Sequence, residues 1–442
     1  PYPYAKLDQI AVPEFNFGAM ENAGAITYRD TILLKDPKTA SMSQRSRQAL
    51  VIAHEMAHMW FGNLVTPKWW NDLWLNESFA SWMALKVVRK VHPEFDLANS
   101  DISSREHAMA SDSAVSTRPI RRDVRVDENM TRLFNSLAYS KGMSVLTMVE
   151  DWLGEDRFRE GMVHYMNQHR WGNADAFDLA DALDRVDDSD INAIVKDFIT
   201  LPGVPLVKVE FVSEDSVRLT QSRYKLFGEF VGVRRAWNIP VILRYSDGEK
   251  DYTQRVLMTE RTATVKLKSA ILRKVDGWIY PNGDEKGYYR WAMEEGELAR
   301  LAGIVRKKFD ARRKLGFLGN VSALFYAGEL QAGEFLRIVG SFNLDPAPEV
   351  VAKVAELLAT MHGDFITEDI ADDYAAYLRD VLGRSLRKIG LTARKNESPH
   401  TASLRADLMG LPGEKGGDAR VMKLARTQAA NYVQDPRPVR PN

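Results

Sequence analysis

Apolar side chains recur at helical spacing through the first part of the chain. Every third or fourth position is apolar in residues 49–61 and again in residues 133–153, with polar residues between them. The first of these segments contains neither glycine nor proline, and Gly62 follows it directly. The pattern therefore predicts long amphipathic helices in a mostly helical region, residues 1–203.

The periodicity changes near residues 201–205, where two prolines and a glycine interrupt the helical pattern. Short β-rich runs follow at 207–211, 239–243 and 262–267, and the first and last of them alternate between apolar and polar residues. Alternation with period two is typical of strands that bury one face. The runs predict a small antiparallel β-sandwich, and we place it at residues 204–291.

Helical spacing returns after Trp291. Amphipathic segments at 295–309, 347–361 and 371–389 are joined by short loops that contain glycine, proline and aspartate. They predict stacked antiparallel helices in residues 292–442, without a repeat of fixed period. The whole pattern indicates a multidomain α+β protein.

Composition changes this picture only slightly. A chain of 442 residues with 45% apolar side chains is expected to form several compact units. Sixty basic and sixty acidic residues cancel, which argues against nucleic acid as a partner. Without cysteine there are no disulfides or thiolate ligands, so cytoplasmic and periplasmic or secreted locations both stay open.

Two further observations concern the membrane and the chain ends. No apolar run approaches the roughly 18 to 20 residues of a spanning helix, so we expect no membrane span. The sequence starts at Pro1 without an initiator methionine or a signal-peptide pattern. We interpret it as a piece of a longer or processed polypeptide.

The chemistry concentrates in the string His54-Glu55-Met56-Ala57-His58, inside the first predicted helix. Residues four apart lie on one helical face, so both imidazoles can bind one metal ion. A catalytic zinc site takes three protein ligands. The third candidate is Glu77, which lies in a second helical pattern and is separated from His58 by eighteen residues. A helix that carries these residues without any metal is the alternative.

Glu55 lies next to a ligand but one step off the binding face. Its carboxylate can therefore act as general base on the attacking water without occupying the metal. Zinc lowers the pKa of a bound water to about 7, so a neighbouring carboxylate can take that proton and pass it to a leaving amine. These parts predict hydrolysis of an amide bond.

At this point the sequence resembles a known family. Gly18-Ala19-Met20-Glu21-Asn22, the HExxH string and Glu77 are together similar to the M1 zinc aminopeptidases, the gluzincins related to aminopeptidase N. The similarity continues through residues 60–66, 69–77 and 140–142 and extends over nearly the whole chain. It implies a thermolysin-like catalytic domain, one zinc ion per chain, and a helical C-terminal domain of HEAT or armadillo type.

The resemblance also assigns roles to two residues that are ambiguous by themselves. It implies that Glu21 binds the free α-amino group of a peptide, beside backbone from Gly18 to Asn22 that lines the substrate path. It implies that the hydroxyl of Tyr139 stabilises the oxyanion. Without it, residues 18–22 read as a turn with an exposed acid, and Tyr139 as a tyrosine that packs in a core.

The predicted function is hydrolysis of the N-terminal peptide bond of peptides that have a free amino terminus. Three departures from the family limit this prediction: the family's amino-terminal β-domain is absent before Pro1, the family's helical domain ends early at Asn442, and Ser78 stands where glycine is usual.

The alternative is a catalytically impaired fragment that binds zinc and peptides. An endopeptidase without an amine anchor, and an epoxide hydrolase related to leukotriene A4 hydrolase, rank lower. Oligomeric state and the preferred amino-terminal residue stay open.

Overall fold

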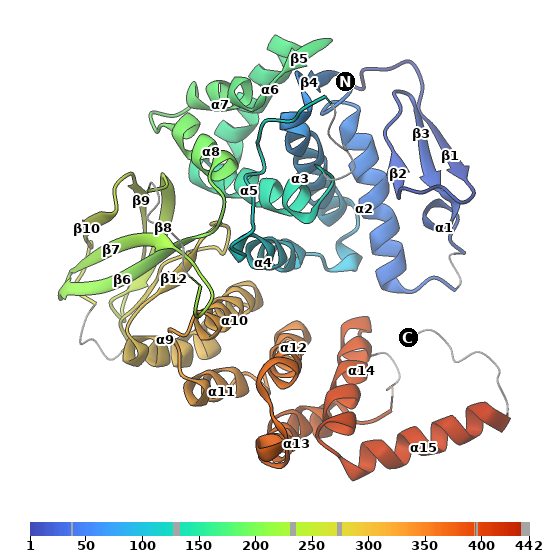
Figure 1. Cartoon of the computed structure of the whole chain (residues 1–442), viewed down its shortest axis with the longest axis vertical. Coiled ribbons are helices and arrows are strands. Elements are labelled where there is room, and N and C mark those ends of the chain that lie inside the picture. Colours follow the sequence, from blue (N-terminus) through green and yellow to red (C-terminus); the bar gives the residue numbers. More distant parts are fainter. Residues whose placement is uncertain are drawn as a thin grey trace. The chain divides into compact units, whose positions relative to one another are not determined.

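The computed structural model describes residues 1–36, 39–126, 133–229, 236–271, 276–392, 394 and 397–434. The chain forms two compact units, Pro1–Glu294 and Glu295–Asn442, which contain helices and several small sheets (Figure 1). A mixed α and β architecture is therefore confirmed. The finer division into domains at residues 203/204 and 291/292 stays a prediction.

The first unit begins with a three-stranded sheet in the order β1-β3-β2. Its strands are β1 (Asp8–Val12), β2 (Ala19–Met20) and β3 (Ala25–Arg29), and the short helix α1 (Asp30–Leu33) follows. Strand β3 runs parallel to β1 and antiparallel to β2. Buried side chains of β3 pack against Met59, which directly follows helix α2 (Met42–His58), so the sheet is fixed to the end of that helix.

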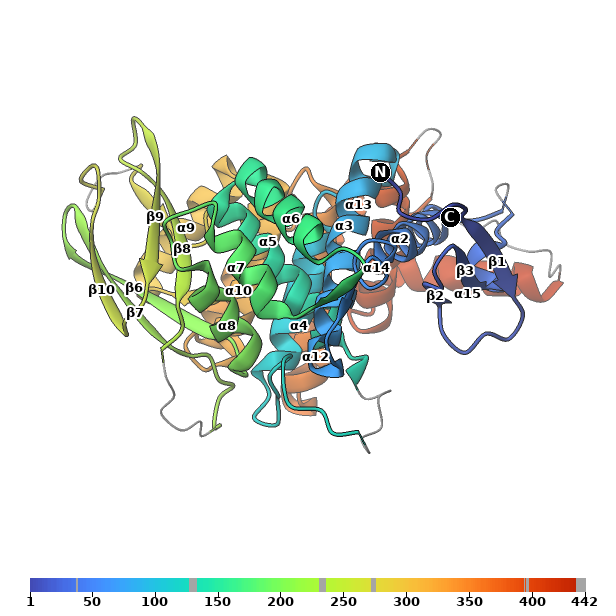
Figure 2. The ribbon, with the colours of Figure 1, turned by 90° about the horizontal axis from the view of Figure 1, so that it is seen from above.

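Seven helices make up the body of the described part of this unit. They are α2 (Met42–His58), α3 (Leu73–Val91), α4 (Ser100–Ser113), α5 (Gly142–Leu153), α6 (Glu155–His169), α7 (Ala176–Asp184) and α8 (Ile191–Thr200). Short elements between them are η1 (Trp70–Asp72), η2 (Pro93–Phe95), the π-helical turn η4 (Leu137–Lys141), and the parallel pair β4 (Val65–Pro67) and β5 (Gly172–Ala174). Figures 1 and 2 show these helices between the β1–β3 sheet and the strands that follow α8.

Two predicted helices differ from those observed. The segment 49–61 belongs to a helix that starts earlier, because Ser41 and Gln44 form a capping box ahead of a polar first half that has no apolar period. The segment 133–153 is helical from residue 136 onward, but its first part is the π-helical turn η4, which continues into α5 at Gly142. Residues 133–135 lie before this helix.

Two small sheets follow α8. One has the order β10-β7-β6-β12 and the other β11-β8-β9. The strands are β6 (Pro205–Ser213), β7 (Ser216–Arg223), β8 (Ile239–Ser246), β9 (Asp251–Met258), β10 (Thr262–Lys266), β11 (Trp278–Tyr280) and β12 (Arg290–Ala292). The three predicted runs lie in β6, β8 and β10. The expectation of a wholly antiparallel arrangement is wrong, because β12 returns from a distant part of the chain to pair parallel with β6.

The second unit is helical throughout its described residues. It contains α9 (Glu295–Lys308), α10 (Ala311–Tyr326), α11 (Ala332–Gly340), α12 (Pro348–Phe365), η5 (Glu368–Ile370), α13 (Ala371–Ile389), α14 (Pro399–Glu414) and α15 (Ala419–Gln434). Helix α13 has the predicted bounds, and α9 and α12 lie within a few residues of theirs. In the described part of the chain, no helix combines the length and apolar character needed to cross a membrane.

Candidate active site

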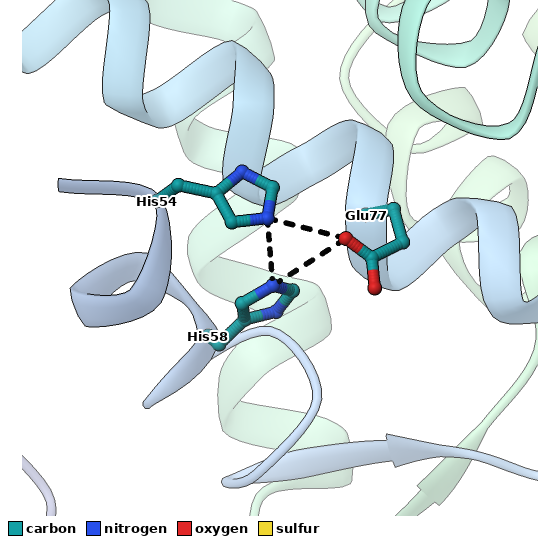
Figure 3. Close-up of side chains that lie close together, drawn as sticks. All are labelled: His54, His58 and Glu77. Atoms are coloured by element: carbon teal, nitrogen blue, oxygen red, sulfur yellow. Dashed lines mark hydrogen bonds and ion pairs between the residues drawn. The ribbon is translucent and has the colours of Figure 1, made fainter. Parts of the chain in front are cut away.

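Three side chains converge where helix α2 ends beside helix α3. His54 and His58 come from the last turns of α2, Glu77 comes from the start of α3, and all three point toward one another (Figure 3). The two Nε2 atoms lie 3.0 Å apart, and Oε2 of Glu77 lies 3.1 Å from Nε2 of His54 and 3.6 Å from that of His58. The structure thus brings the three predicted metal ligands together.

These distances are close to those between the ligands of a zinc ion, and two of them are slightly shorter. Nitrogen and oxygen ligands at about 2.0 to 2.2 Å from tetrahedral zinc lie roughly 3.2 to 3.6 Å from each other. The set of two imidazoles and one carboxylate is also typical of catalytic zinc. His54, His58 and Glu77 are therefore the residues that would hold the metal.

A second group of atoms fixes the orientation of His58. Its Nδ1 donates to the carbonyl oxygen of Phe61 at 3.0 Å and to Oδ1 of Asn76 at 2.9 Å. The two acceptors fix a proton on Nδ1, and Nε2 is the ring nitrogen that faces Glu77. Gly62 permits this arrangement, because its φ is +123° and a Cβ there would lie 2.1 Å from Oδ1 of Asn76.

His54 has a weaker partner of the same kind. Its Nδ1 lies 3.3 Å from Oγ of Ser81, which is one helical turn beyond Glu77 on α3. The hydroxyl can accept a hydrogen bond from Nδ1–H, and Nε2 is then the nitrogen that could bind a metal ion. Helix α3 thus supplies one ligand and supports both imidazoles.

Glu55 is buried beside the ligands, with 6% of its surface exposed. Its Oε2 has no hydrogen-bond partner among the described residues. Burial raises the pKa of its carboxyl to about 8, because the nearby charge of His58, which lowers the pKa, offsets burial only in part. A divalent cation next to Glu55 would favour the ionised form.

Glu77 shows the opposite behaviour. Burial alone would raise the pKa of its carboxyl, but hydrogen bonds and charge from the two imidazoles lower it to about 2. The ionised form of Glu77 is therefore favoured, whereas Glu55 binds a proton more readily. Glu21 and Glu55 lie close to each other and to His58, and a cation bound here would balance the charge of these carboxylates.

Glu21 directly follows the edge strand β2. Its Oε1 lies 4.0 Å from Nδ1 of His58 and accepts a hydrogen bond from Nδ2 of Asn76 at 3.2 Å. The amide of Asn63 also donates to the backbone oxygen of Glu21 at 2.8 Å. Two asparagines therefore fix both the side chain and the backbone of Glu21.

In the rest of the segment 18–22, Ala19 and Met20 form β2, Gly18 precedes this strand, and Asn22 follows Glu21 after it. Ala19 and Met20 pair with Tyr28 and Thr27 of β3, and Asn22 donates to the hydroxyl of Thr27 at 3.2 Å. Within the described residues β2 has a strand partner on one side only. Such an edge leaves backbone groups open to pair with an extended chain.

Tyr139 lies on the turn η4 against the same group. Its ring stacks on that of His54, with centroids 6.2 Å apart and an angle of 26° between the planes. Burial, followed by the charge and hydrogen bonding of Glu77, raises the pKa of its hydroxyl far above the usual value. The hydroxyl thus stays protonated and can donate a hydrogen bond.

The sequence reasoning missed two supporting residues, Asn76 and Ser81. Both lie on α3, Asn76 immediately before Glu77 and Ser81 four residues after it. The sequence signal for both residues was their position near Glu77. A polar side chain on a mostly apolar helix needs a hydrogen-bond partner when it is buried. Which imidazole each contacts depends on how α2 and α3 cross.

Two histidines four residues apart on one helix, with a glutamate on the next, are typical of one class of protein, the zinc metallopeptidases. Comparison with known proteins agrees. Residues 1–198 match the model of the peptidase family M1 domain, and residues 278–442 match an ERAP1-like C-terminal domain. The chain belongs to peptidase family M1, whose members are in general zinc-dependent.

Three similar relatives have curated names. The chain is 31% identical to Aminopeptidase 2 of Candida albicans, over 100% of this chain and 48% of that protein. It is 35% identical to Leucyl aminopeptidase of Saccharolobus solfataricus, over 82% and 44%. It is 30% identical to Alanine/arginine aminopeptidase of Saccharomyces cerevisiae, over 94% and 48%. The chain thus spans about half the length of these relatives.

Proposed function

We propose that this chain carries the active site of a zinc-dependent aminopeptidase, which hydrolyses the first peptide bond of peptides that have a free amino terminus. His54, His58 and Glu77 bind the metal, Glu55 is the general base, Glu21 binds the amine, and Tyr139 stabilises the oxyanion. Membership of the M1 family and the names of the relatives support this function.

One observation carries the assignment of exopeptidase over endopeptidase. Asn76 contacts His58 with one end of its amide and Glu21 with the other, at 2.9 Å and 3.2 Å. A carboxylate is therefore fixed beside the metal ligands. It can pair with the α-ammonium of a peptide in a charge-assisted hydrogen bond, and this pairing selects the first peptide bond over internal ones.

The proton transfers follow from the two buried groups. When bound, zinc would polarise the scissile carbonyl and make an attacking water more acidic. Glu55 takes a proton from that water with its unpaired oxygen and delivers it to the leaving amine. The isosteric glutamine cannot perform either transfer.

Tyr139 and strand β2 act on the substrate from other directions. The protonated hydroxyl of Tyr139 donates to the oxygen on which negative charge develops. The open edge of β2 pairs with the backbone of the peptide and holds it extended while Glu21 holds its amino end. Binding at both points orients the reacting carbonyl.

The test compares two chromogenic substrates that differ only at the amino group. A leucine amide of a dye with a free amine is expected to be cleaved by the zinc-loaded protein, whereas its N-acetylated twin is expected to be resistant. Equal rates for both substrates would overturn the role of Glu21 and favour an endopeptidase. A chain that binds zinc stoichiometrically but cleaves neither would favour the impaired peptide-binding fragment.

A further inference from the structure

A buried hydroxyl connects the metal-ligand helix to the turn that carries Tyr139. Oγ of Ser78, the residue after Glu77, donates to the carbonyl oxygen of Ala138 at 2.6 Å. Ser78 is 0% exposed and Ala138 is 6% exposed. Ser78 and Ala138 therefore link two catalytic positions, because each is the sequence neighbour of one of them.

The two elements approach so closely that they leave no space for another side chain. Gly142 begins α5 directly after the turn, and a Cβ there would lie 2.0 Å from Oγ of Ser78 and 2.7 Å from the ring of Trp74. Only glycine allows α3 and the turn to meet at this distance.

Other side chains hold the turn at its two ends. Oδ1 of Asn135 accepts from the backbone N–H groups of Leu137 and Ala138 at 3.0 and 3.1 Å. At the far end, Nζ of Lys141 lies 2.8 Å from a carboxylate oxygen of Asp112, and both side chains are 0% exposed. Ser78 supplies the contact between these ends, next to Tyr139 itself.

We propose that Ser78 is a positioning residue for Tyr139, and that its hydroxyl sets the distance between the oxyanion donor and the metal ligand Glu77. The inference rests on the proposed function. Without the hydroxyl, the carbonyl of Ala138 loses a buried hydrogen-bond donor, and the turn relaxes to compensate. Since Ser78 and Glu77 are adjacent on α3, movement of the turn displaces Tyr139 relative to the metal.

The experiment removes the hydroxyl with Ser78→Ala and follows both structure and kinetics. Hydrogen exchange of a peptide that covers residues 134–145 is expected to become faster, with unchanged exchange in α2 and unchanged zinc content. We expect kcat to fall about tenfold and KM to stay within about twofold, because a misplaced oxyanion donor affects the transition state more than the bound substrate.

Ser385→Ala is the matched control. Ser385 is also a buried serine, and its Oγ donates to the carbonyl oxygen of Asn343 in the second unit. This change is expected to leave exchange in residues 134–145 and kcat unaltered. An equal loss of kcat in both variants would overturn the proposal, since general destabilisation would then explain it.

A double-mutant cycle with Tyr139→Phe isolates the pathway. If Ser78 acts through Tyr139, Ser78→Ala has no further effect on kcat once the tyrosine hydroxyl is gone. The same tenfold loss in both backgrounds would overturn the proposal. If the unsubstituted protein has no turnover, the aminopeptidase function fails, and the exchange experiment decides the role of Ser78 alone: faster exchange supports the tie to the turn, and unchanged exchange refutes it.

Discussion

Oδ1 of Asn76 lies 2.9 Å from Nδ1 of His58 and accepts a hydrogen bond from it, so that Nε2 is the imidazole nitrogen that could bind a metal ion. Loss of such a partner typically weakens a metal site 10- to 100-fold. We expect Asn76→Ala to lower zinc affinity by about this factor, measured by competition with a chelator. Asn173→Ala removes an amide on the exposed surface and serves as control. Equal affinities in Asn76→Ala and the unsubstituted protein would contradict this role.

The division of roles between two glutamates gives the second prediction. Glu55→Gln keeps the shape of the side chain but cannot move a proton, so we expect full zinc content and loss of most turnover. Glu77→Ala removes a ligand, so we expect the zinc content itself to fall. Metal analysis and single-substrate kinetics on both variants decide the matter. Equal loss of zinc would show that Glu55 is itself needed to retain the metal.

The contrast between ligands and their partners shows what the sequence could reveal. The i, i+4 spacing of His54 and His58 predicts one shared helical face, and that geometry holds in any α-helix. Neither the pairing of Asn76 with both His58 and Glu21 nor the contact of Ser78 with Ala138 has such a local rule. Both depend on how α2, α3 and η4 pack, and a periodic pattern does not specify that packing.

The same limit applies to the elements themselves. Runs that alternate in polarity correctly predicted β6 and β10, because the alternation follows from burial of one face. The apolar run of β8 also predicted a strand, and its side chains are buried on both faces. The parallel pairing of β12 with β6 joins distant segments of the chain and left no local signal. Likewise, the apolar spacing of residues 133–153 hid the turn η4, because one extra residue per turn hardly alters the pattern.

Glu21 gives the third prediction. Glu21→Gln removes the charge that would pair with the α-ammonium, and a charge-assisted hydrogen bond is worth about 1.5 to 3 kcal/mol. We therefore expect kcat/KM for a free aminoacyl amide to fall about 10- to 150-fold. Zinc content should stay constant, because Glu21 is not among the three ligands. Kinetics unchanged by the substitution would argue for an enzyme that does not recognise the amine.

Tyr139 gives the fourth. Tyr139→Phe removes one donor to the developing oxyanion but leaves the ring that stacks on His54. Loss of one such donor lowers kcat about 10²- to 10³-fold, and we expect an effect of this size without loss of zinc. Tyr245→Phe, which removes a hydroxyl bonded to Gln254 in the sheet, is the control. A Tyr139→Phe variant with normal kcat would assign this tyrosine to packing.

The last prediction concerns the buried pair of Lys141 and Asp112. Burial raises the pKa of the Asp112 carboxyl, but the charge and hydrogen bond of Lys141 outweigh it, and the pKa is lower than usual. A carboxyl with a depressed folded-state pKa stabilises the fold above its unfolded pKa of about 3.9, and the stabilisation is lost as pH falls further. The pair therefore stabilises the first unit at neutral pH and fails in acid.

Lys141→Met leaves Asp112 buried without its partner, which costs about 3 to 5 kcal/mol at pH 7. The carboxyl keeps its hydrogen bonds from Thr117, Gly203 and Tyr288, but without the charge of Lys141 its pKa rises. It is then protonated more readily, so the stability difference from the unsubstituted protein should shrink as pH falls from 7 toward 4. Urea unfolding at several pH values measures this. Lys208→Met breaks an exposed pair with Glu210 and should change stability by less than about 1 kcal/mol at every pH. A loss for Lys141→Met as small as that of the control, or one independent of pH, would mean that the buried charges do not stabilise each other.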